Sequence, residues 1–240
     1  MWAKQSLPYQ VARNIAASGD AVACVVCFEH SEVYLYQRLL CLESAQNAAS
    51  EARVTLADIQ QVIGEKDASF EKLLENSLAA AEAWSRLVHY WERLFLIKGH
   101  PSKTTLNTLD IYLSWLSAYG ERVVLFVDYL QKIPVLLAGI EMTDERHIRL
   151  VTEGLKNLAL AHKVPIVAVA ASDEEGLKNG HVRFQDLWGG SSIQYEPDVA
   201  LLLNRGLGET VTFSVDKNRQ GPVMQEFSLQ LCGETFSFRA

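Results

Sequence analysis

The feature that most constrains this sequence is an apolar run that ends in an aspartate. Five apolar residues, Val123 to Val127, lead directly into Asp128. So many consecutive apolar side chains indicate a strand that is buried on both faces, as in a parallel sheet. Open sheets of this kind bind ligands at the carboxyl ends of their strands. Asp128 therefore either helps to hold a ligand at that edge or simply ends the strand.

Composition limits the class of protein. The 240 residues suffice for one large or two small domains, and their net charge is −7. This charge argues against a chain that coats nucleic acid through bulk positive charge, but it allows a local basic patch. We find no segment of membrane-spanning length and no secretory signal, so we expect a cytoplasmic protein without membrane contact.

Cysteine usage agrees with a reducing compartment, because the four cysteines are few for this length. Cys24 and Cys27 form a CxxC pattern, but they lie inside the apolar run of residues 21–28 and no second pair exists. Strand alternation points the two side chains to opposite faces. We expect buried small apolar residues here rather than a metal or redox site.

Alternating patterns along the chain predict one α/β domain over residues 1–240, with a mostly parallel sheet flanked by helices and a C-terminal antiparallel hairpin. Residues 52–92 are mostly helical in pattern. The predicted strands are 21–28, 94–98, 123–128, 165–171 and 198–204, the predicted helices are 6–18, 32–49, 108–119 and 144–162, and the hairpin joins 210–217 to 223–231.

Two motifs carry a family resemblance: Asp128-Tyr129-Leu130-Gln131, and Lys217-Asn218-Arg219-Gln220-Gly221-Pro222. Together they resemble the Walker B strand and the basic hairpin of the C-terminal ATPase domain of bacterial replicative DNA helicases (DnaB-type). Further segments match in order, at residues 28–40, 155–167 and 186–198. The resemblance covers roughly residues 4–47 and 94–231, so residues 48–93 are expected to be an insertion.

The resemblance implies a RecA-like P-loop NTPase core. It also implies an ATP-dependent DNA helicase motor for DNA replication, a hydrolase that uses ATP and Mg²⁺. The expected partners are single-stranded DNA and further copies of the chain, since the family usually forms a hexameric ring. A motor of this kind couples phosphoryl transfer to movement, mainly by positioning and charge stabilisation.

Carried over by position, Asp128 would orient the magnesium ion, and Glu29 would polarise the attacking water. Lys217 and Arg219 would reach the γ-phosphate bound by a neighbouring subunit, for which a planar guanidinium is well suited. Strand alternation places both basic side chains on one face of the hairpin. The alternatives are a solvated acid at a strand end and a solvated hairpin tip.

DNA contact would come from the loop at residues 173–190. Its cations are Lys178, His181 and Arg183, and Trp188 stands where the family often has arginine. Trp188 would stack on a base, or it would pack as an ordinary aromatic residue. The whole segment also fits a surface loop.

The sequence departs from the family at the nucleotide. A P-loop has the pattern GxxxxGK[ST], in which backbone amides wrap a phosphate and the hydroxyl binds magnesium. Here Ala3-Lys4-Gln5 replaces Gly-Lys-Thr, without the preceding glycine loop and strand. Lys4, Gln5 and the neighbouring Ser6 are the remaining candidates for the cofactor site. In addition, Ala170-Ala171 stands where the family has Ser-Gln.

Three interpretations follow. The first is a helicase motor domain, with weak or absent ATPase activity in this polypeptide alone. The second is a non-hydrolysing structural or regulatory relative, and the third is another RecA-like ATPase of the recombinase or clock type. The two family motifs favour the helicase branch. Without the first strand of the fold, its neighbours would expose unpaired edges. We expect another segment or a second chain to fill that gap.

Overall fold

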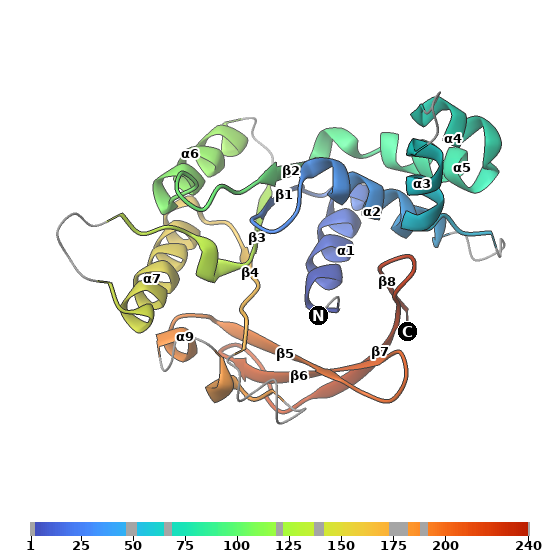
Figure 1. Cartoon of the computed structure of the whole chain (residues 1–240). Helices are drawn as coiled ribbons and strands as arrows, with labels where there is room; N and C mark the ends of the chain where they lie inside the picture. Colours follow the sequence, from blue (N-terminus) through green and yellow to red (C-terminus); the bar gives the residue numbers. More distant parts are fainter. Residues whose placement is uncertain are drawn as a thin grey trace.

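The computed structural model describes residues 3–46, 52–64, 69–118, 122–136, 142–172, 182–187 and 192–239. These residues form an upper layer of helices around a parallel sheet and a lower antiparallel sheet (Figure 1). Among the helices in these ranges, none is both long and apolar enough to cross a membrane.

The parallel sheet has the strand order β2-β1-β3-β4. All residues of β1 are buried, and β3 is almost as fully covered, as the apolar runs predict. Cys27 at the end of β1 is level with Asp128 at the end of β3, so both strands finish at one edge. The four strands are β1 (Val22–Cys27), β2 (Leu94–Lys98), β3 (Val123–Asp128) and β4 (Ile166–Ala168).

Helices cover both faces of this sheet, and each face has its own apolar core. Cys24 belongs to the core beneath α6 and α7, and Cys27 to the core beneath α1 and α2, so the predicted opposite orientation of the two cysteines is confirmed. Gly19 ends the first helix with φ +80°, a conformation that glycine adopts without strain. The helices are α1 (Ala3–Ser18), α2 (Glu32–Ser44), α6 (Leu106–Ser117) and α7 (Asp144–His162).

The segment between α2 and β2 is helical, as predicted, where the structure describes it. Its helices pack on α2 through a third core that includes Phe236 from the C-terminal region. That this segment is an insertion stays a prediction. The helices are α3 (Leu56–Ile63), α4 (Phe70–Asn76) and α5 (Leu78–Val88), and the short turns elsewhere are η1 (Trp91–Arg93), η2 (Leu130–Lys132) and η3 (Phe184–Asp186).

The antiparallel sheet has the strand order β5-β6-β7-β8. The predicted hairpin is confirmed as β6 and β7, and it gains a strand on each side. Phe213 stacks on Phe227 and is fully buried in the small core of this sheet. The strands are β5 (Val199–Arg205), β6 (Thr210–Asn218), β7 (Glu226–Cys232) and β8 (Ser237–Arg239), and the short helix α9 (Ser192–Tyr195) precedes them.

The prediction of a buried strand at residues 165–171 is wrong in two respects. The strand β4 spans only three residues, and Val167 is 40% exposed. The physical reason is that β4 pairs with β3 alone, so no described strand lies along its second edge. Within the described residues, the second edge of β4 is therefore open.

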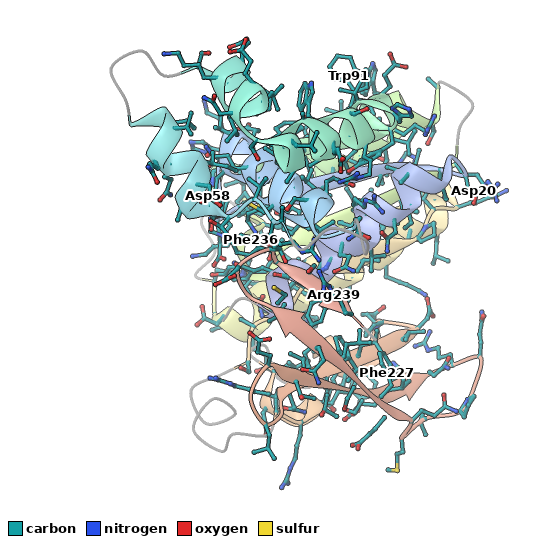
Figure 2. All side chains as sticks on the ribbon, turned by 90° about the vertical axis from the view of Figure 1, so that its right-hand side faces the viewer. Asp20, Asp58, Trp91, Phe227, Phe236 and Arg239 are labelled. Atoms are coloured by element: carbon teal, nitrogen blue, oxygen red, sulfur yellow. The ribbon has the colours of Figure 1, made fainter. Side chains whose placement is uncertain are left out.

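Polar contacts from the helices of the upper layer hold the antiparallel sheet. On one side, Gln10 of α1 donates to the Phe238 carbonyl (2.9 Å) and accepts from its N–H (2.6 Å). On the other side, Lys156 of α7 contacts Asp198 at 2.6 Å. Figure 2 shows Phe236 and Arg239 where the antiparallel sheet meets the helices above it. Among the described residues, the lower sheet is thus attached through helices rather than through strand pairing.

A buried carboxylate ties α1, α2 and α5 together. Glu43 is fully buried and contacts the Arg13 guanidinium, and it accepts a 2.5 Å hydrogen bond from Tyr90. Arg86 donates to the Glu43 carbonyl at 2.9 Å. Burial, with Glu43 alongside, raises the pKa of Tyr90, so its hydroxyl remains a donor.

Substitution Glu43→Ala is expected to lower the free energy of unfolding by about 3–5 kcal/mol, because buried cationic and hydroxyl groups lose their partner. Urea unfolding measures this change. The control is Glu82→Ala in α5, since Glu82 is partly exposed and lies 3.8 Å from Arg86. That change is expected to cost less than about 1 kcal/mol. Equal effects of the two substitutions would contradict the assignment.

Candidate nucleotide site

The candidate site lies at the carboxyl edge of the parallel sheet. Glu29 and His30 follow β1, and Asp128 ends β3, the adjacent strand. The Phe28 N–H donates to the Asp128 carbonyl at 2.8 Å, which holds the two strand ends together. The two acids singled out by the sequence therefore leave neighbouring strands at one edge.

The two acids differ in environment. Asp128 is only 1% exposed, and its Oδ2 lies 3.8 Å from the Cys27 sulfur. Burial raises the pKa of Cys27 and of Tyr9, whose ring packs nearby, so both groups stay protonated. Glu29, in contrast, is exposed to solvent. The carboxylate assigned to the metal is thus enclosed, whereas the one assigned to water is accessible.

Gln5, in the first turn of α1, engages the exposed acid. Its side-chain amide donates to the Glu29 carboxylate, and its Oε1 lies 3.3 Å from Nε2 of His30. In a P-loop, the residue at this position carries a hydroxyl. Here it is Gln5, whose amide bridges Glu29 and His30 after β1. This contact engages the carboxylate for which the sequence predicts a role in positioning water.

Ser6 is also engaged by a neighbouring side chain. Its Oγ accepts a 2.9 Å hydrogen bond from Arg38 of α2, and Arg38 is only 5% exposed. The guanidinium lies over the rings of Phe236 and Tyr9, at 4.3 and 5.3 Å from their centroids. Sequence reasoning assigned no role to Arg38, although a cation among the apolar positions of a helix signals a buried partner.

The remaining positions of the cofactor site are less informative. Lys4 lies in the first turn of α1, but its side chain is outside the described part of the structure. Ala171 follows β4, and its backbone is held by Gln131, which donates to the Ala171 carbonyl at 3.2 Å and accepts from its N–H at 3.3 Å. Gln131, from the Asp-Tyr-Leu-Gln motif, therefore orients the chain after β4.

These residues do not fit a bound magnesium–phosphate group by themselves. Mg²⁺ requires accessible oxygen ligands in a near-octahedral arrangement. Asp128 is enclosed, Ser6 is bonded to a cation, and Glu29 is bonded to Gln5. Within the described ranges, no three His, Cys, Asp or Glu side chains gather as metal ligands.

Lys217 lies on β6 in the antiparallel sheet, and Arg219 follows the exposed end of that strand. Lys217 donates to the carbonyls of Gln194 and Tyr195 at 2.7 and 2.8 Å. Arg219 donates to the Tyr195 carbonyl at 2.7 Å and to Asp198 at 3.2 Å. Both cations thus bind the carboxyl end of α9 in their own chain, and the hairpin tip beyond them is exposed.

The predicted DNA loop is only partly described. Lys178, His181 and Trp188 lie outside the described residues, so their predicted roles stay predictions. Arg183 is exposed, and its backbone N–H donates to Asp186 at 2.9 Å. The adjacent Val182 is anchored to β5, because Asn204 bonds to both of its backbone groups.

Comparison with protein families matches residues 2–240 to the family described as "DnaB-like helicase C terminal domain". A replicative DNA helicase DnaB of Mycoplasma pneumoniae is 23% identical over 222 residues, which are 85% of this chain and 42% of that protein. The DnaB of Mycoplasma genitalium is 24% identical over 202 residues, which are 78% and 39% of the two chains. The chain thus spans less than half the length of these relatives.

Solved structures show the same fold. A solved ATPase domain superposes with a TM-score of 0.81 at 17% identity, covering 99% of this chain and 80% of that one. A DnaB-like replicative helicase, described with its primase interactions, also gives a TM-score of 0.81 at 17% identity and covers 99% and 54%. At this identity, the likeness shows the fold alone.

His30 provides a test of the site's electrostatics. Burial, followed by the nearby Arg38, lowers the pKa of His30 below its ordinary value of 6.5, and Glu29 acts in the opposite direction. We expect an NMR titration midpoint below 6.5, and a further decrease in Glu29→Gln. Because the pKa of His30 is lower in the folded than in the unfolded chain, neutral His30 adds to the free energy of unfolding above pH 6.5. This contribution is lost as the pH falls through the folded-state pKa. A midpoint above 6.5 would contradict the arrangement.

Proposed function

We propose that this chain, which belongs to the DnaB-like helicase C-terminal domain family, acts as the motor domain of a ring-shaped replicative DNA helicase. The substrates in this role are ATP with Mg²⁺ and single-stranded DNA, and the assembly is a ring of further copies. Such a motor needs an acid for the metal, an acid for water and a cation delivered to the developing charge.

The arrangement of the two acids supports this role. Glu29 follows β1 and Asp128 ends the adjacent β3, at the edge where open α/β sheets bind ligands. In this proposal Asp128 would hold the metal ion and Glu29 would orient the attacking water only once Gln5 releases Glu29 and Asp128 becomes accessible. The first turn of α1, with Lys4, Gln5 and Ser6, lies at the same edge, because Gln5 contacts Glu29.

The basic hairpin supports a site shared between subunits. Arg219 is half exposed, beside an exposed tip, and its partners belong to its own antiparallel sheet region rather than to the Glu29 edge. In this proposal Lys217 and Arg219 serve the nucleotide of an adjacent subunit. Arg183 and the loop around it, with Lys178 and Trp188, contact DNA.

The contact of Gln5 with Glu29 also supports a restricted activity for these 240 residues alone. An amide cannot replace a magnesium-bound hydroxyl, and it ties up the carboxylate that would activate water. This observation favours, as the second candidate function, a relative that keeps the fold and the subunit contact without hydrolysis.

The isolated chain is expected to hydrolyse ATP below about 0.01 per second, at least ~100-fold under the range typical of phosphoryl-transfer enzymes. Steady-state phosphate release with Mg²⁺, with and without single-stranded DNA, measures this rate. Glu29→Gln is the matched variant, because it keeps the shape of the side chain and removes its charge. Robust turnover that Glu29→Gln abolishes would overturn the expectation of weak hydrolysis and support the catalytic role of Glu29.

A further inference from the structure

Arg38 in α2 is a buried cation without an acidic partner. It is only 5% exposed, and its Nε has no hydrogen-bond partner among the described residues. Within the same ranges, no ion pair joins Arg38 to a carboxylate. Burial lowers the pKa of Arg38, and the charge of Asp128 is among the effects that oppose this shift. Because a buried charge is costly, other groups must stabilise this guanidinium.

Aromatic rings from three parts of the chain lie against this guanidinium. Its Cζ is 4.3 Å from the ring centroid of Phe236, 5.3 Å from that of Tyr9 and 5.9 Å from that of Tyr34. Such contacts stabilise a cation through the negative face of the ring, and they are stronger where both groups are shielded from water. Phe236 is the nearest of the three and is only 6% exposed. Its ring is therefore the principal support of Arg38.

The backbone at Phe236 adopts the left-handed conformation, with φ 55°. A bulky side chain rarely adopts this conformation, and it persists only where the surrounding structure holds it. The two neighbours of Phe236, Thr235 and Ser237, are both buried, and their hydroxyl oxygens lie 2.8 Å apart. Figure 2 shows Phe236 where the antiparallel sheet meets the helices. The turn between β7 and β8 thus holds the ring against Arg38.

On its other side, Arg38 reaches the first turn of α1. It donates a 2.9 Å hydrogen bond to the hydroxyl of Ser6. The residue before Ser6 is Gln5, whose side-chain amide donates to Glu29. Because the first N–H groups of a helix have no partner within the helix, a first turn frays unless side chains hold it. Arg38 therefore anchors the turn from which Gln5 contacts the candidate acid.

These contacts connect the antiparallel sheet to the first turn of α1. Strand β6, which carries Lys217, pairs with β7, and β7 pairs with β8. Phe236 lies directly before β8 and contacts Arg38, which in turn holds Ser6. A continuous path of contacts thus runs from the strand of the basic hairpin to the helix turn that engages Glu29.

We propose that Arg38 is a positioning residue for Glu29, and that the ring of Phe236 couples it to the antiparallel sheet. When the β7–β8 turn shifts, the guanidinium loses its support, the first turn of α1 loosens, and Gln5 releases Glu29. A load on the basic hairpin is thereby transmitted to the acid of the same chain. The meaning of this link for hydrolysis rests on the proposed function, whereas the link itself is tested without nucleotide.

The reporter is the side-chain amide of Gln5, because it donates to Glu29. Its NMR resonances in the 240-residue chain are assigned by their loss in Gln5→Ala. Phe236→Leu removes the ring and keeps an apolar side chain. We expect the Gln5 resonances to move toward those of a solvent-exposed amide, and the backbone amides of Leu7 and Tyr9 to exchange at least ~10-fold faster. Unchanged resonances or unchanged exchange rates would overturn the proposal.

Two control variants separate positioning from a general loosening of the fold. Val151→Ala leaves a cavity in the core on the other face of the sheet, where Val151 of α7 is fully buried. It is expected to lower the melting temperature without moving the Gln5 resonances. Phe236→Tyr keeps an aromatic ring over the guanidinium and is expected to retain the original resonances. Equal shifts in Val151→Ala and Phe236→Leu, or a full shift in Phe236→Tyr, would contradict the role of the ring.

Because contact alone does not establish coupling, a double-mutant cycle tests whether Phe236 acts through Arg38. Arg38→Met keeps the apolar stem and removes the donor to Ser6. If the ring acts through the guanidinium, Phe236→Leu accelerates exchange of the Leu7 amide in the original chain but adds less than ~2-fold in Arg38→Met. Effects that multiply would show independent routes and refute the coupling. Since no nucleotide is present, failure of this test is distinct from failure of the proposed ATPase role.

Discussion

The parallel pairing of β1 with β3 is the interaction on which the rest of this structure depends. Six residues of each strand are in register, and both strands are nearly free of solvent contact. The pairing places Cys27 beside Asp128 and brings Glu29 to the same edge. It also provides two apolar faces for the flanking helices. The candidate site is therefore a consequence of the strand register, rather than of any local loop.

Helix α1 is the second determinant, because it belongs to both halves of the molecule. Its first turn touches Glu29, its middle binds β8 through Gln10, and its buried face covers β1. The antiparallel sheet is thereby held in place, although no strand in the described ranges pairs it with the parallel sheet. The stacking of Arg38 on Phe236 adds a contact between α2 and the same C-terminal region.

Sequence patterns were sufficient for the elements whose surroundings are complete. The buried strands β1 and β3 and the helix α7 follow from apolar runs and periodicity, and the hairpin follows from its turn residues. The exposure of β4 could not be predicted from its own residues, because burial depends on what lies alongside. For the same reason, the partners of Gln5 and Arg38, which lie 24 and 32 residues away, required the fold.

Lys156 and Arg219 share the carboxylate of Asp198, and this bears on the proposed contact of Arg219 with an adjacent subunit. Its pKa is held below the ordinary value, first by the hydrogen bond from Lys156 and also by Arg219. Because Lys156 approaches closer than Arg219, at 2.6 against 3.2 Å, the carboxylate stays neutralised when the guanidinium turns away. Exposed ion pairs are weak in any case. In the proposed assembly, Arg219 could therefore exchange Asp198 for an anion on an adjacent subunit while Asp198 stays paired with Lys156.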